Sequence, residues 1–239
     1  MNKPTQLIFP FQINQKASFE SFFCSPSNFN LMARLNEIAI SKDTHELIIH
    51  GEEGAGKSFL MQAICNELSS SGKHFAFIPM NKALNMGAEI FQNLASLDTV
   101  CIDDLQLMLA HEDWETALFN LINECQQSNC SLILSLGGNR PIEENTELPD
   151  LLSRIKRMEF IELHAVQDEF FNQAIDFVAQ QLDIKMEKTE LEFLLKHQTR
   201  KFSLLVNNII ALDKQAASLK RKITIPLIKE TLNICLLYT

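Results

Sequence analysis

Residues 51–58 read Gly51-Glu52-Glu53-Gly54-Ala55-Gly56-Lys57-Ser58 and match the pattern G-x-x-x-x-G-K-[ST] at every constrained position. Its glycines let backbone N–H groups turn inward around phosphate oxygens, at the positive end of the helix that follows. We expect Gly51, Gly54, Ala55, Gly56, Lys57 and Ser58 to bind the phosphates of ADP or ATP. Lys57 would reach the β- and γ-phosphates, and Ser58 would hold Mg²⁺.

A second acidic motif follows the apolar run at 99–102, which ends in Asp103-Asp104. This pattern is typical of a Walker B segment, in which Asp103 binds Mg²⁺ through water and Asp104 orients or deprotonates an attacking water. The alternative for Asp104 is the N-cap of the next helix. Asn139 follows the apolar run at 132–136 and either senses the γ-phosphate or belongs to a turn.

Strand-like runs alternate with helical periodicity through the first two thirds of the chain. Strands are predicted at 47–50, 75–78, 99–102, 132–136 and 159–163, and helices at about 58–69, at 84–95 and through Trp114 to Cys125. Alternation at this spacing favours a parallel sheet covered by helices on both faces. The predicted fold is α/β, of the P-loop nucleoside triphosphatase (NTPase) type.

The periodicity changes after Leu163. Apolar residues then repeat at intervals of three and four, as in the segments at 171–182 and 204–212, with further helices near 190–197 and 225–233. We therefore expect a tail at 1–16, the α/β domain at 17–165 and a small all-helical lid at 166–239.

Charge is distributed unevenly. The formal net charge is −9: residues 1–165 carry −10, and residues 166–239 carry +1. A protein that holds DNA by itself normally presents a basic face, because affinity comes from neutralising phosphates. The only basic cluster, Lys220-Arg221-Lys222, is typical of a solvated helix end. Autonomous DNA binding is disfavoured.

The six cysteines form no CxxC pair, the histidines form no HExxH motif, and no apolar run approaches the roughly 18 residues of a membrane span. We identify no signal peptide at the amino terminus. These features favour a reducing cytoplasm, with neither a structural zinc nor a membrane partner.

Several motifs together resemble the AAA+ ATPases and, more closely, the bacterial replication initiator DnaA. The segment at 102–106 is similar to its IDDIQ motif, and 138–141 to its S-D-R-P turn. The stretches at 19–22 and 26–28 resemble the segment that borders adenine, which implies nucleotide contacts for Phe22 and Asn28. Leu151-Leu152-Ser153-Arg154 resembles the segment that bears the arginine finger, which implies that role for Arg154.

Two traits set the chain apart from the initiator. It ends shortly after the lid, so we expect no helix-turn-helix DNA-binding domain. It begins with Gln6-Leu7-Ile8-Phe9-Pro10-Phe11, which resembles the peptide that bacterial proteins insert into the sliding clamp, the DNA polymerase III beta subunit. An extended segment of this kind can place Leu7, Phe9 and Phe11 in apolar pockets, with Pro10 favouring extension and Gln6 fixing register. The alternative is a strand or staple packed on the chain's own sheet.

Both traits are similar to those of a DnaA-related regulatory inactivator. The resemblance implies a clamp-docked protein that offers Arg154 to ATP held by DnaA, and that meets DNA only through the clamp. The matching sensor arginine of the lid is replaced by Ser203, with Arg200 three residues earlier, which implies weak hydrolysis by the chain itself. Two alternatives remain: an independent ATPase such as a helicase loader, and a clamp-bound adaptor whose nucleotide is structural. The oligomeric state, a homo-oligomer included, is left open.

Overall fold

The computed structural model describes residues 11–138, 141–197 and 201–233. The chain divides between His164 and Ala165 into two compact units. The first contains a five-stranded parallel sheet in the order β2-β3-β4-β1-β5. Its strands are β1 (Glu46–Gly51), β2 (Phe75–Pro79), β3 (Thr99–Asp103), β4 (Ser131–Gly137) and β5 (Glu159–Glu162).

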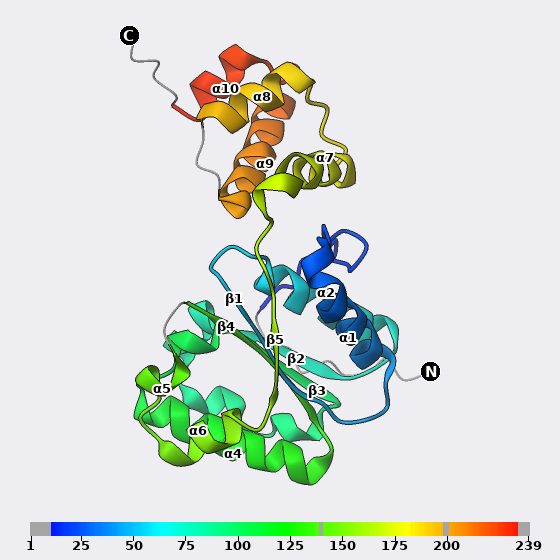
Figure 1. Ribbon diagram of the computed structural model, residues 1–239. Coiled ribbons are helices and arrows are strands. Elements are labelled where there is room, and N and C mark those ends of the chain that lie inside the picture. Colours follow the sequence, from blue (N-terminus) through cyan, green and yellow to red (C-terminus); the bar gives the residue numbers. More distant parts are fainter. Residues whose placement is uncertain (1–10, 139–140, 198–200, 234–239) are drawn as a thin grey trace. The chain divides into compact units, whose positions relative to one another are not determined.

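Helices cover both faces of this sheet (Figure 1). One face carries α2 (Lys57–Ser70), which contacts β1 to β4, with α1 (Phe29–Ile40) packed against it. The other face carries α4 (Glu112–Ser128) and α6 (Pro149–Ile155), and α5 (Ile142–Asn145) lies between β4 and α6 in the chain. The predicted fold is confirmed.

Strands β1 to β4 are largely buried because helices cover both faces of this part of the sheet, whereas the edge strand β5 is mostly exposed. Alternate strand residues share one apolar cluster with side chains of α4 and α6, and the strand members include Ile48, Val100, Ile102, Leu132 and Leu134. β3 is buried along its whole length, which explains why it reads as a continuous apolar run instead of an alternating one.

The prediction of a helix at 84–95 is wrong. After α3 (Met80–Ala83) the chain forms short 3₁₀ turns, η2 (Leu84–Met86), η3 (Ala88–Phe91) and η4 (Leu94–Ser96). Positive φ angles at Gly87 and Asn93 interrupt any continuous helix there. The apolar spacing instead lets Phe91 and Leu94 enter the core beneath α4. Helix α1 was not predicted. The remaining turns of this unit are η1 (Pro26–Asn28) and η5 (Leu105–Leu107).

The second unit is helical: it contains η6 (Asp168–Phe170), α7 (Phe171–Gln181), α8 (Lys188–His197), α9 (Phe202–Leu219) and α10 (Ile225–Thr231). Its own apolar core includes Ile175, Leu194, Leu205, Ile209 and Ile228. Ser203 is half-buried in the first turn of α9. Arg200 lies outside the described residues.

Candidate nucleotide site

The loop at 51–58 joins β1 to α2, the local context that a phosphate-binding loop requires. Its first residue must be glycine, because a Cβ on Gly51 would lie 2.3 Å from the carbonyl oxygen of Leu163. That close approach lets Leu163 donate a backbone hydrogen bond to His50, at 2.7 Å. The end of the first unit therefore runs directly beside the start of the loop.

Lys57 fills the inside of this loop. Its Nζ donates hydrogen bonds to the carbonyl oxygens of Gly51 (2.9 Å) and Glu52 (2.8 Å), and the residue is 6% exposed. Burial lowers the pKa of Lys57, and the negative charges of Asp104, Asp103 and Glu53 oppose that shift. The ammonium thus lies between the glycine loop and two acidic residues, Asp103 at the end of β3 and Asp104 directly after it.

Asp103 is 3% exposed at the end of β3. Burial raises the pKa of its carboxyl group, while hydrogen bonds from the hydroxyls of Ser135 and Ser58 act in the opposite direction. Ser58 and Asp103, which are 45 positions apart in the sequence, therefore meet. A hydroxyl and a carboxylate are the oxygen ligands that Mg²⁺ prefers, so these two residues fit the ion predicted here.

Asp104 has left the strand and adopts a left-handed conformation (φ 61°, ψ 50°). Its N–H donates to Ser135 Oγ at 2.9 Å, and its Oδ1 accepts a hydrogen bond from Gln106 Nε2 at 3.0 Å. Gln106 Oε1 in turn accepts the N–H of Gly137, at 2.7 Å. Asp104 also occupies the N-cap position of η5, but its side chain makes no capping hydrogen bond there.

Sequence reasoning missed Ser135 and Gln106. Ser135 is fully buried in the middle of the apolar run of β4, and a hydroxyl in such a position is the signal that could have found it, because a buried polar group needs a partner. Gln106 lies inside the matched 102–106 segment, but nothing in the sequence places it opposite β4.

Phe22 lies against the phosphate-binding loop. A Cβ on Gly56, whose φ is 107°, would lie 2.9 Å from the Phe22 ring, and that ring stands 6.1 Å from the ring of Phe59. Phe22 therefore lies beside the loop, and its contact with a nucleotide stays a prediction.

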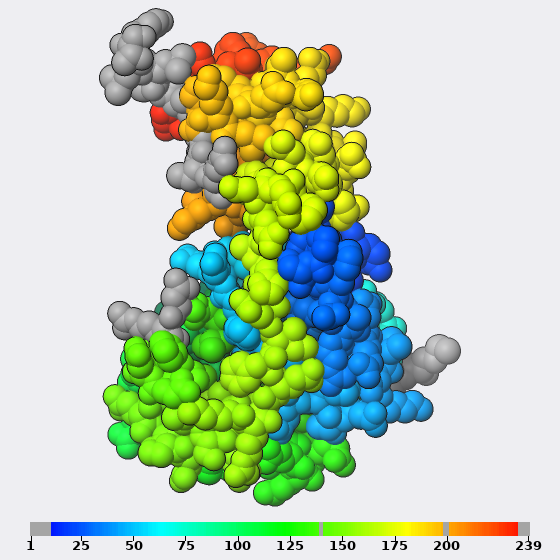
Figure 2. Space-filling model, in the orientation of Figure 1, coloured from blue at the N-terminus to red at the C-terminus, as the bar shows by residue number. Residues whose placement is uncertain are grey.

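Asn28 is buried and bound to the backbone of His164. Its Nδ2 donates to the carbonyl oxygen of His164, and the N–H of His164 donates to Asn28 Oδ1, both at 2.9 Å. Nδ2 also contacts Ser25 Oγ. Figure 2 shows the N-terminal segment, in blue, lying along the yellow-green segment that ends the first unit. The side-chain amide of Asn28 thus joins these two segments by hydrogen bonds within the protein.

Arg154 lies in the last turn of α6 and is half-buried. Its Nη1 donates to Gln126 Oε1 at 3.3 Å, and within 11–138, 141–197 and 201–233 no carboxylate forms an ion pair with it. Its neighbour Lys156 is paired with Glu143 at 2.9 Å, whereas Arg157 is exposed. Among the residues that the structure describes, the guanidinium of Arg154 therefore makes one hydrogen bond, to a neutral amide.

Some predicted site residues lie outside the described residues: Asn139, Gln6, Leu7, Phe9 and Pro10. Phe11, the last residue of the predicted clamp peptide, is half-buried and packs against the apolar cluster of the first unit. For that one residue the structure shows the packing contact that the alternative interpretation expected.

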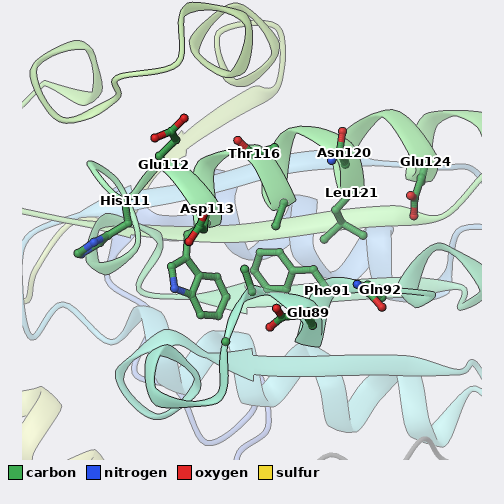
Figure 3. A pocket seen from close by; sticks show the side chains of 14 residues that line it. Glu89, Phe91, Gln92, His111, Glu112, Asp113, Thr116, Asn120, Leu121 and Glu124 are labelled. Carbon is green, nitrogen blue, oxygen red and sulfur yellow. The ribbon is translucent and has the colours of Figure 1, made fainter.

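A cavity of about 940 Å³ lies away from these residues, between α4 and the segment at 87–92 that contains η3 (Figure 3). Four acidic residues line it, Glu89, Glu112, Asp113 and Glu124, and none of its lining residues is a lysine or arginine. The edge-to-face pair of Phe91 and Trp114, 5.3 Å between centroids, forms part of the wall. None of the predicted site residues lines this cavity.

Both units of the chain match known protein families. Residues 13–162 match the bacterial DnaA ATPase domain. The chain belongs to the DnaA ATPase family. Residues 168–232 match the lid domain of Hda, so the family match extends across both units, and the predicted kinship with DnaA-like AAA+ proteins is confirmed.

Solved structures agree on the fold. Domain III of the replication initiation protein DnaA from Thermotoga maritima is 20% identical, with a TM-score of 0.77 over 93% of this chain and 98% of that one. AMPPCP-bound DnaA from Aquifex aeolicus is 19% identical, with a TM-score of 0.65 over 87% and 69%. The RuvB branch migration motor of Thermotoga maritima is 16% identical, with a TM-score of 0.64 over 92% and 73%.

None of the helices in the described part of the chain has the length and apolar character needed to cross a membrane.

Proposed function

We propose that this protein is a cytoplasmic negative regulator of chromosomal replication initiation, which docks on the DNA-loaded sliding clamp and stimulates ATP hydrolysis by DnaA. The observation that carries the proposal is the match of residues 168–232 to the lid domain of Hda, on a chain whose first unit belongs to the DnaA ATPase family. The clamp peptide at 6–11 and the arginine at 154 supply the two contacts that such a regulator requires.

The nucleotide of this chain, ADP or ATP, would bind at the 51–58 loop. AMPPCP bound to DnaA proteins of the same fold supports this assignment. Lys57 would exchange its two backbone carbonyl partners for phosphate oxygens, which are stronger acceptors for an ammonium group. Ser58 and Asp103 would hold Mg²⁺, which supplies charge neutralisation between the phosphates.

Arg154 would act on ATP held by DnaA. A planar guanidinium placed against the transferring phosphoryl group stabilises the charge that spreads over its oxygens in the transition state. The contact with the neutral Gln126 amide supports this role, because exchanging an amide contact for a phosphate costs less than breaking an ion pair, and no ion pair of Arg154 is present among the described residues.

The decisive experiment measures hydrolysis of DnaA-bound ATP in the presence of this protein, clamp and DNA. Arg154→Ala should keep its nucleotide and its clamp affinity but lose the stimulation, since arginine fingers supplied in trans are worth roughly 10³–10⁵ in rate. Arg154→Lys should restore only part of it, because an ammonium cannot bridge two oxygens in the same fork geometry. The exposed Arg157 provides the matched control, and Arg157→Ala should retain most of the activity. Full stimulation by Arg154→Ala would exclude the arginine-finger proposal and favour a clamp-bound adaptor.

Clamp binding is tested separately. Gln6→Ala and Leu7→Ala should each weaken binding by about 1–3 kcal/mol, as for anchor residues of a short peptide. Phe11→Ala should in addition lower the melting temperature, because Phe11 packs against the apolar core of the first unit. Clamp affinity that survives deletion of residues 1–10 would contradict the assignment of the peptide.

A second candidate is an independent ATPase, such as a helicase loader. The hydrogen-bonded arrangement around Asp104 favours it, because an oriented carboxylate beside Lys57 is what hydrolysis by the chain itself requires. Multiple turnover by the isolated protein, at a rate that DnaA and clamp leave unchanged, would support this candidate over the regulator.

A further inference from the structure

The side chain of Gln106 connects the ends of two strands at the nucleotide site. Its Nε2 donates to Asp104 Oδ1 at 3.0 Å, and its Oε1 accepts the N–H of Gly137 at 2.7 Å. Both partners fix the orientation of the amide: a backbone N–H can only donate and an ionised carboxylate can only accept, so the oxygen must face Gly137 and the nitrogen Asp104.

Gly137 is shaped for this contact. A Cβ at that position would lie 2.9 Å from Gln106 Nε2, closer than Cβ atoms approach other atoms in folded proteins, and 3.3 Å from its Cδ. Any larger residue at this position would therefore force the Gln106 amide to move away from the end of β4. The contact spans 31 positions in the sequence, so it depends on β3 and β4 being neighbours in the sheet.

Asp104 is held from two sides as a result. Its backbone N–H is fixed by Ser135 Oγ and its Oδ1 by Gln106. Within the described residues, only Oδ1 of this carboxylate accepts a hydrogen bond. Among the nearby carboxylates, Asp104 has the largest effect on the pKa of Lys57. Oδ1 is thus fixed by Gln106, whereas Oδ2 remains available to another hydrogen-bond donor. This oxygen belongs to a carboxylate near Lys57, the residue expected to contact the phosphates.

We propose that Gln106 is a positioning residue for hydrolysis of ATP by this chain: it fixes Asp104 Oδ1 to the end of β4 so that Oδ2 receives the proton of the attacking water. The proposal rests on the nucleotide site proposed above. In that step the water oxygen bonds to the γ-phosphorus, and the bond from this phosphorus to the β–γ bridging oxygen breaks. ADP leaves with that electron pair, and the proton passes from Asp104 to the released phosphate.

The test is single-turnover hydrolysis of ATP by the full chain without DnaA or clamp, together with the dissociation constant for ATP. Gln106→Met removes both hydrogen bonds at similar volume, Gln106→Glu removes the donor to Asp104, and Gly137→Ala pushes the amide away. Each should lower the rate about tenfold, which corresponds to about 1.4 kcal/mol of activation free energy, with the ATP dissociation constant changed less than about twofold. Gln92→Glu, at an exposed glutamine of the same unit, is the control and should leave both quantities unchanged.

A double-mutant cycle separates positioning from a merely structural role. If Gln106 acts through Asp104, Gln106→Met should cause no further loss of rate in an Asp104→Asn background. A structural residue of η5 would instead lower the melting temperature and reduce the rate equally in both backgrounds, which would overturn the proposal. An unchanged or increased rate in Gln106→Met, or no hydrolysis by the parent chain in a single turnover, would also overturn it. Failure of the nucleotide site itself would be recognised separately, as absent ATP binding by the parent chain.

Discussion

Lys57 is a buried ammonium group that donates two hydrogen bonds to backbone carbonyls of its own loop. Because burial lowers its pKa, the free protein carries an unfavourably desolvated charge that bound phosphates would stabilise. Lys57→Ala should weaken ADP binding about 100-fold, the loss of a charge-assisted contact of up to about 3 kcal/mol. Titration calorimetry measures this. Lys82→Ala, at an exposed lysine of the same unit, should bind ADP as the parent does, and equal affinities for Lys57→Ala and the parent would exclude the phosphate-loop assignment.

Asn28 exchanges two hydrogen bonds with the backbone of His164, the last residue of the first unit. Asn28→Ala leaves a backbone N–H and C=O without these partners, so we expect the free energy of unfolding to fall by about 1–3 kcal/mol. Thermal or denaturant unfolding without nucleotide measures the loss. The exposed Asn85 offers the control, Asn85→Ala. If Asn28→Ala unfolds like the parent in the absence of ligand but binds ADP more weakly, Asn28 contacts the nucleotide and does not stabilise the fold by joining the two segments.

At the level of secondary structure, the start of β1 is packed against a basic side chain of α1. His45 Nδ1 lies 3.4 Å from Arg34 Nη2, and His45 Nε2 is buried without a partner among the described residues. Burial, and then the charge of Arg34, lower the pKa of His45 below its ordinary 6.5, while Asp43, Glu37 and Glu159 oppose the shift. The folded state therefore favours the neutral ring.

A pH dependence of stability follows from this packing. The unfolded chain binds a proton at His45 near pH 6.5 but the folded chain resists it, so the stability contributed by the neutral ring is complete above that pH and is lost as pH falls through the folded pKa. The free energy of unfolding should decrease as the pH is lowered from 7 to 5, and His45→Gln should flatten this decrease. Fluorescence of Trp114, the single tryptophan, reports unfolding of the first unit. Parallel pH profiles for parent and variant would contradict the assignment.

At the level of the whole molecule, net charge decides which macromolecules the protein meets directly. With a net charge of −9 and a pI of about 5.2, the chain repels the phosphate backbone, and counterion release offers little gain. We expect no binding to duplex DNA at about 150 mM salt without the clamp, and recruitment to DNA when the clamp is loaded on it. Fluorescence anisotropy of labelled DNA measures both. Micromolar affinity for duplex DNA without the clamp would contradict this expectation. If that affinity decreased steeply with salt concentration, the protein would have a local basic surface despite its negative net charge.

The amino-acid sequence by itself determined the parts of this protein that depend on local backbone requirements and periodicity. The glycine loop at 51–58, the acidic end of the strand at 99–103 and the helical lid could be predicted because each leaves a continuous pattern along the chain. The segment at 84–96 shows the limit of such patterns. Its apolar spacing is compatible with a helix, but positive φ at Gly87 and Asn93 divides it into turns.

Only the tertiary structure decided which distant residues meet. Gln106 contacts Gly137 because β3 and β4 are adjacent in the sheet, and Asn28 pairs with His164 across 136 positions. Phe11, predicted as part of a docking peptide, packs against the core of its own unit. The physical reason is the same in each case. A motif specifies the conformation of the residues that compose it. A hydrogen bond or packing contact between distant segments depends on strand order and register, and these are set by interactions along the whole chain.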